Sequence, residues 1–233
     1  QIKQYDVFSR VVQGNGSTGT SVVLITPDAE RTMNTHLGIC KEYNVKDIDE
    51  KLLMSSSFLY FTGYMWDTDS QKVAIQKAVD IARSNNLKIC FDVADPFVVE
   101  RNREEFLEFI KNSVDIVFAN QPELLIMFQS KDIDQSIDRL MNIVKCGGVK
   151  LGKKGSIVFN NFKRNNIEPK LISAKDTTGA GDMYAAGFLS QFFKTNDYIA
   201  SGKMGSALAE EIVQINGAQF DKKKMNQIRS NIF

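Results

Sequence analysis

The chain has 233 residues, 43% of them hydrophobic and 24% charged, a balance typical of one folded domain, alone or with a small appendage, and not of a disordered chain. Its 29 basic and 28 acidic side chains nearly cancel, which leaves no overall charge to recruit nucleic acid or an anionic membrane. No run approaches the ~20 apolar residues of a membrane span, and no signal-peptide pattern opens the chain. Three scattered cysteines without a C-x-x-C pair, and a single histidine, argue against a disulfide framework or a zinc site and favour a cytoplasmic setting.

The first 35 residues predict a small β unit. Residues 20–26 form a β-branched run, Pro27 and Asp28 start a turn, and residues 30–33 can return as a second strand. We therefore expect a β lid within residues 1–35, with its hairpin at about residues 18–33, and an α/β domain over residues 36–233.

From about residue 57 the chain alternates short apolar runs with longer amphipathic stretches. The expected strands cover residues 58–61, 87–93 and 115–119, and the expected helices cover residues 69–84, 104–111 and 123–128. Short strands separated by helices pair in parallel through crossover connections. Sheets of this kind bind ligands beyond the carboxyl ends of their strands.

The string DTTGAGD, residues 176–182, leads directly into a predicted helix. Its two glycines let backbone N–H groups converge on one point, and the helix dipole adds positive potential there. Such an anion hole suits a phosphoryl group that is being transferred. Asp182 read alone is equally well explained as a helix cap, which stabilises a helix by roughly 0.5–2 kcal/mol.

Taken whole, this string resembles the C-terminal signature of the PfkB (ribokinase-like) carbohydrate and nucleoside kinases, and other segments agree with the family in the same order. Asn120 and Glu123 resemble its N-x-x-E motif, residues 150–155 its strand and turn beside the nucleotide, and residues 217–218 its segment near the adenine. The hairpin region resembles its lid. Without the other motifs, Asn120 and Glu123 are more simply a helix cap and a surface acid.

The resemblance implies a ribokinase-like α/β fold, with a mostly parallel sheet flanked by helices on both faces and a small β lid. It also implies an in-line transfer of the γ-phosphate of ATP to a primary hydroxyl, with Asp182 as the general base. The implied anion hole consists of Thr178, Gly179, Ala180 and Gly181. Asp176 and Thr177 would support this loop.

The resemblance further implies ATP and Mg²⁺ as cofactors, and it is compatible with a monovalent cation such as K⁺. The implied nucleotide-binding residues are Asn120, Lys150, Gly152, Gly155, Gly217 and Ala218. Glu123, directly or through water, and Asn120 would hold the Mg²⁺. The expected partner is a small nucleoside or sugar, with no nucleic acid or membrane, and the expected state is a monomer or a homodimer.

Residues 33–38 and 92–97 resemble adenosine-kinase-type members more than ribokinase itself. Thr62 stands where several members have an acid, and Asp92 stands where many have Asn. The family's first strand, its Gly-Gly-Asn motif and its sugar-gripping aspartate precede the lid hairpin, and nothing in the chain matches them. The resemblance thus implies that this chain holds the ATP-binding side, the general base and only part of the acceptor pocket.

The sequence leaves three functions open. The first is a kinase that phosphorylates a nucleoside of adenosine type. The second is a kinase of the same family that acts on a free sugar resembling ribose or fructose. The third, from another class, is a nucleotide-binding protein or fragment without turnover.

Overall fold

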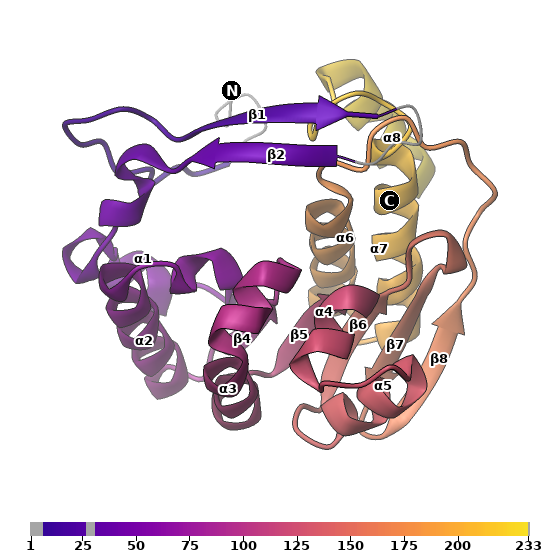
Figure 1. Ribbon diagram of the computed structural model, residues 1–233, viewed down its shortest axis with the longest axis horizontal. Helices are drawn as coiled ribbons and strands as arrows, with labels where there is room; N and C mark the ends of the chain where they lie inside the picture. Colours follow the sequence, from indigo (N-terminus) through magenta and orange to yellow (C-terminus); the bar gives the residue numbers. More distant parts are fainter. Residues whose placement is uncertain (1–6, 27–30, 233) are drawn as a thin grey trace.

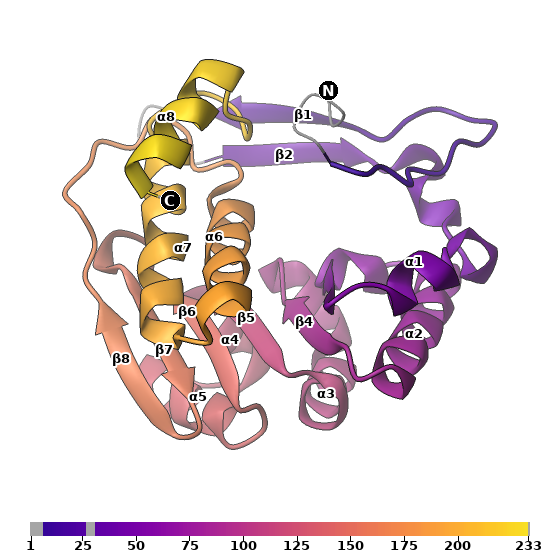
Figure 2. The same cartoon turned by 180° about the vertical axis from the view of Figure 1, so that it is seen from behind.

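The computed structural model describes residues 7–26 and 31–232, and in this part of the chain two separate sheets form. The first is an antiparallel hairpin of β1 (Thr20–Ile25) and β2 (Arg31–His36). Its strands agree with the predicted lid, while the predicted turn at Pro27 and Asp28 lies outside the described residues. The hairpin lies across the rest of the molecule from the α1 side toward α8 (Figures 1 and 2).

The second sheet has six strands in the order β3-β4-β5-β6-β7-β8. They are β3 (Phe58–Thr62), β4 (Lys88–Asp92), β5 (Ile116–Asn120), β6 (Cys146–Lys150), β7 (Ser156–Asn160) and β8 (Lys163–Ile167). The first four are parallel, and β7 and β8 extend the sheet in antiparallel register. The predicted mostly parallel α/β sheet is therefore confirmed.

Helices cover both faces of this sheet. The α-helices of the described residues are α1 (Glu50–Met54), α2 (Asp69–Ser84), α3 (Pro96–Ser113), α4 (Gln121–Met127), α5 (Ile133–Met141), α6 (Ala180–Thr195), α7 (Tyr198–Ile212) and α8 (Lys222–Ile232). The last of them, α8, packs against α7 and not against the sheet. Among the described residues, no helix is both long and apolar enough to cross a membrane.

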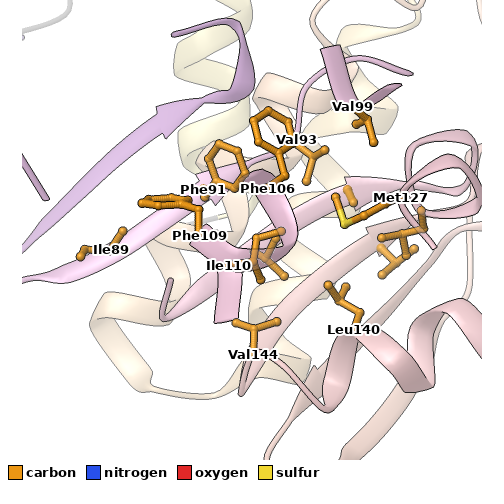
Figure 3. Packing of buried hydrophobic residues seen from close by; sticks show 14 of the residues in the cluster. Ile89, Phe91, Val93, Val99, Phe106, Phe109, Ile110, Met127, Leu140 and Val144 are labelled. Atoms are coloured by element: carbon orange, nitrogen blue, oxygen red, sulfur yellow. The ribbon is translucent and has the colours of Figure 1, made fainter. Parts of the chain in front are cut away.

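Each face of the sheet has its own hydrophobic core. On one face α2, α3, α4 and α5 bury their apolar sides against the strands, with Phe91 of β4 packed against Phe106 and Phe109 of α3 (Figure 3). On the other face Tyr184 and Phe188 of α6 pack against Phe118 and its neighbours. The alternation of side chains along a strand produces the two faces.

The helix predicted at residues 104–111 is longer than expected, because α3 begins at Pro96. Asp95 accepts hydrogen bonds from the N–H groups of Phe97 and Val98 at 2.8 and 3.3 Å, and Pro96 occupies the first turn. Because these residues begin a helix well, α3 starts before the predicted range of 104–111.

Candidate active site

The last residues of four neighbouring strands form a polar row. They are Thr62, Asp92, Asn120 and Lys150, which end β3, β4, β5 and β6. Thr62 lies opposite Asp92 in the strand register, and Asn120 lies opposite Lys150. Because the four strands are parallel, the row lies along one edge of the sheet, where ligands of such sheets bind.

A buried ion pair joins two members of this row. The Nζ of Lys150 lies 2.9 and 3.2 Å from the two carboxylate oxygens of Asp92. The Asp92 side chain is 5% exposed and that of Lys150 17%. Burial alone would lower the pKa of Lys150, but the carboxylates of Asp92 and Glu123 outweigh it, so the pKa is raised and the ammonium stays charged.

Glu123 lies beside this pair and begins α4 together with Asn120. The N–H and Nδ2 of Asn120 donate to the two Glu123 carboxylate oxygens at 2.7 and 2.6 Å, and Asn120 Oδ1 accepts from the Glu123 N–H at 2.9 Å. This is a capping box, so the cap interpretation of Asn120 is correct. The surface-acid interpretation of Glu123 is wrong, because its side chain is fully buried. Burial raises its pKa to about 7, against the opposing effect of Lys150.

The loop of residues 176–179 leads into the N-terminus of α6, and we call it the anion loop after its predicted role. Gly179 is the N-cap with a φ of 79°, and a Cβ on it would lie 2.8 Å from the Cβ of Ala218. Only glycine combines this left-handed conformation with so close a packing. Because α6 begins at Ala180, its N–H groups open toward the loop, and Asp182 stands exposed in the first turn instead of at the N-cap.

Asp176 stabilises this loop through hydrogen bonds. Its side chain is 1% exposed, and its Oδ1 accepts from the N–H and the hydroxyl of Thr178 at 2.9 and 2.6 Å. Its Oδ2 accepts from the N–H of Gly217 at 2.7 Å. One carboxylate thus connects the anion loop to the 217–218 segment. The family resemblance predicts that this segment lies near the adenine.

A tight turn follows Lys150 at the same edge of the sheet. The Leu151 N–H donates to the Gly155 carbonyl at 2.8 Å, and Gly152 begins the short helical turn between them. Gly155 has a φ of 82°, and a Cβ there would lie 2.1 Å from the Ile167 carbonyl oxygen. The turn therefore requires glycine at this position.

The loop at α6 and the strand-end row belong to one site. A Cβ on Gly181 would lie 3.3 Å from the Nζ of Lys150. The charge of Asp182 also acts on Lys150 and on Tyr60, whose pKa is raised chiefly by burial and then by Asp92 and Asp182. The sequence named all of these elements except Tyr60 and the pairing of Asp92 with Lys150.

The donor set tests the fit of a magnesium ion. Within residues 7–26 and 31–232, no group of three or more His, Cys, Asp or Glu side chains is placed to hold a metal. Both oxygens of Glu123 already accept hydrogen bonds from Asn120. The residues therefore fit an ion held mainly by phosphate oxygens and water, with one nearby carboxylate, which is how Mg²⁺ commonly binds beside nucleotides.

This architecture, a mostly parallel sheet with helices on both faces, a β lid and a glycine loop opening a helix, defines a ribokinase-like fold. The family model for pfkB family carbohydrate kinases matches residues 1–225. The chain therefore belongs to that family, whose members are phosphotransferases with an alcohol group as acceptor.

Solved structures agree with this assignment. An adenosine kinase from Sinorhizobium meliloti is 34% identical with a TM-score of 0.88, covering 91% of this chain and 66% of its own. A probable sugar kinase from Rhizobium etli is 30% identical with a TM-score of 0.90, covering 97% and 69%. An E. coli protein assigned as ribokinase II, solved in complex with ATP and Mg²⁺, is 20% identical with a TM-score of 0.76, covering 85% and 66%. The chain thus spans about two thirds of the length of each.

Proposed function

We propose that this protein transfers the γ-phosphate of ATP to a primary hydroxyl of a nucleoside of adenosine type, with Asp182 as the general base. The observation that carries the proposal is the position of Asp182. It is an exposed carboxylate in the first turn of α6, beside the anion loop and near enough to the buried Lys150–Asp92 pair for its charge to act on Lys150. A base so placed can meet a hydroxyl at the point where a terminal phosphate would be held.

The reaction is a direct displacement. The acceptor oxygen forms a bond to the γ-phosphorus as its proton passes to Asp182, and the bond between that phosphorus and the bridging oxygen of ADP breaks. Of the predicted anion hole, the N–H groups of Gly179 and Gly181 hold the charge of the phosphoryl group. The N–H of Thr178 instead donates to Asp176, and that of Ala180 donates to the Thr177 carbonyl. Glu123 and Asn120 would hold Mg²⁺, which would neutralise charge on the phosphates when bound. Most of the acceleration comes from positioning and electrostatics, and the base adds a further ~10²–10⁴-fold.

Asp182→Asn tests the base directly. The amide keeps the shape of the side chain and cannot take a proton, so kcat should fall at least ~10²-fold while the Kd for ATP changes little. Steady-state kinetics and calorimetry on the same preparation give both numbers. Near-normal turnover of Asp182→Asn would remove Asp182 from the mechanism.

Asp134→Asn is the matched control. Asp134 is an exposed acid in the first turn of α5, and its ion pair with Arg164 is exposed as well. An amide there should leave turnover unchanged, which separates the loss of a base from the general loss of a helix-terminal charge.

The acceptor is a nucleoside in this proposal, because residues 33–38 and 92–97 resemble the adenosine-kinase type and the S. meliloti adenosine kinase is 34% identical. The similarity to the R. etli probable sugar kinase supports the free-sugar alternative. Turnover with a panel of adenosine, ribose and fructose decides between them. Faster turnover of a free sugar favours the alternative, and ATP binding without turnover on any acceptor favours a non-catalytic nucleotide-binding role.

A further inference from the structure

The Lys150–Asp92 pair is built across a strand that contributes neither residue. Asp92 ends β4 and Lys150 ends β6, while β5 lies between them in the sheet. Neighbouring strands are ~4.8 Å apart, so the two backbones are separated by about 10 Å. The Lys150 side chain therefore crosses the carboxyl end of β5 to reach Asp92, 2.9 Å from its nearer oxygen.

Both side chains point to the face covered by α6. Gly148 lies two residues before Lys150, and a Cβ on it would lie 2.8 Å from the ring of Tyr184 in α6. Cys90, two residues before Asp92, belongs to the cluster packed against the same helix. Since alternate residues of a strand share a face, the pair lies under the N-terminal turn of α6.

The ammonium lies directly against the anion loop. Its Nζ is 3.3 Å from the position that a Cβ on Gly181 would occupy. Three carboxylates act on it: Asp92, Glu123 and Asp182. Of these, Asp92 makes hydrogen bonds to the ammonium through both oxygens, so Asp92 determines where the charge sits.

Stability alone does not account for such a pair. Removing two charges from water costs about as much as their attraction returns, and apolar replacements of buried pairs are often neutral or stabilising. A buried cation fixed beside a helix N-terminus, by contrast, adds to the positive potential that a terminal phosphate would meet.

We propose that Asp92 is a positioning residue for phosphoryl transfer, because it holds the Lys150 ammonium under Gly181, where the cation faces the terminal phosphate of the bound nucleotide. The inference rests on the proposed kinase function and extends it to a residue that reaches the phosphate through Lys150. Asp92 Oδ1 also accepts from the Ala94 N–H at 3.1 Å, a bond that the amide oxygen of Asp92→Asn can keep. It explains why an acid stands at position 92, and it assigns Lys150 to the γ-phosphate end of the nucleotide.

The test compares ATP with ADP, because only ATP carries the terminal phosphate. Calorimetry in the presence of Mg²⁺ gives the Kd of each nucleotide for the wild type and for Asp92→Asn. We expect Asp92→Asn to weaken ATP binding at least ~10-fold more than ADP binding, and kcat to fall ~10–100-fold, since misplacement of a group by about 1 Å can cost ~10²-fold. Asp115→Asn, whose carboxylate pairs with Lys88 at the amino end of β4, should change neither the nucleotide preference nor kcat.

A charge swap, Asp92→Lys with Lys150→Asp, separates positioning from stability. The swap rebuilds an ion pair but moves the ammonium from β6 to β4. We expect it to recover thermal stability relative to Lys150→Asp alone while the preference for ATP stays lost. Should the swap not fold, Asp92→Asn still decides the question.

The two proposals fail differently. The inference is wrong, while the kinase function stands, if Asp92→Asn keeps the wild-type ATP preference and kcat and only its Tm falls. It is also wrong if the charge swap restores the ATP preference and kcat. In either case Asp92 is merely structural. If the wild type binds no nucleotide, or transfers phosphate to neither nucleosides nor sugars, the proposed function fails and this inference fails with it.

Discussion

Strand β4 carries an ion pair at each end, and the two pairs differ in burial far more than in geometry. At its amino end Lys88 meets Asp115 with a separation of 3.1 Å, and at its carboxyl end Asp92 meets Lys150 at 2.9 Å. The first pair is 55% and 36% exposed, whereas the second is 5% and 17% exposed. The same contact is therefore a solvated surface feature at one end and a desolvated one at the other.

The difference shows that the fold desolvates charged side chains at the carboxyl end of the sheet and leaves them in solvent at the amino end. An exposed pair is worth ~0–1 kcal/mol because water screens it and both side chains lose freedom. A buried pair stabilises little overall, but the loss of one partner leaves an uncompensated charge in the interior. The carboxyl end of the sheet thus concentrates charges that are strongly coupled to one another, as sites of chemistry do.

The largest expected effect on stability comes from removing Lys150, and Lys88 is the matched control at the other end of β4. Lys150→Met should lower the free energy of unfolding by ~3–5 kcal/mol, because Asp92 and Glu123 then lie buried without their cation. Lys88→Met should cost ~0–1 kcal/mol. Denaturant unfolding of both variants measures the contrast, and equal losses would show that burial does not distinguish the two ends.

Partial recovery in a double variant sharpens this contrast. Adding Asp92→Asn to Lys150→Met removes one of the stranded charges, so the double variant should be more stable than Lys150→Met alone. A further loss of stability would mean that Asp92 contributes through contacts other than its pairing with Lys150.

A smaller effect is expected at Asp176. Asp176→Asn can still accept from Thr178, but its amide N–H group would face the N–H of Gly217, which now donates at 2.7 Å. The loss should be ~1–3 kcal/mol, the cost of an unsatisfied buried polar group, and ATP affinity should fall because the anion loop loosens. Asp115→Asn, which also accepts from a backbone N–H but lies partly in solvent, should cost ~1 kcal/mol or less. Similar losses in both variants would contradict the comparison.

The sequence predicted those parts of the fold that depend on local pattern. Residues 69–84 have helical periodicity and form α2 with the predicted bounds, and the run at residues 58–61 lies within β3. The string at 176–182 pointed to the α6 loop because its glycines and aspartate are adjacent in the chain.

The rest depends on packing that no local pattern encodes. Asp92 and Lys150 are 58 residues apart, and they meet only because two strands end at the same edge with a third between them. The signal available in the sequence was a charged residue at the end of each strand: Asp92 ends β4 and Lys150 ends β6. Glu123 was read as a surface acid when taken alone, because its burial follows from the packing of α4 on the sheet.

The smallest effect concerns the cysteine thiols near the amino end of the sheet. There the charged side chains are exposed, but the cysteines themselves are buried. Cys146 begins β6 and lines a cavity of about 840 Å³, yet its side chain is 5% exposed, and burial raises its pKa to about 12. Cys90 is fully buried and its pKa is also raised by burial, whereas Cys40 is exposed. Since the thiolate is the reactive form, a pKa near 12 leaves roughly one thiol in ten thousand reactive at pH 8.

A chromogenic disulfide reagent should therefore modify about one thiol per chain rapidly at pH 8, and the other two only as fast as the protein opens. Cys40→Ser should abolish the fast phase and leave the slow one unchanged, whereas Cys146→Ser should leave the fast phase intact. A rapid second equivalent that disappears in Cys146→Ser would show that the cavity at the amino end admits reagents to the core. The amino end of the sheet would then expose its core to reagents as well as its charges to solvent.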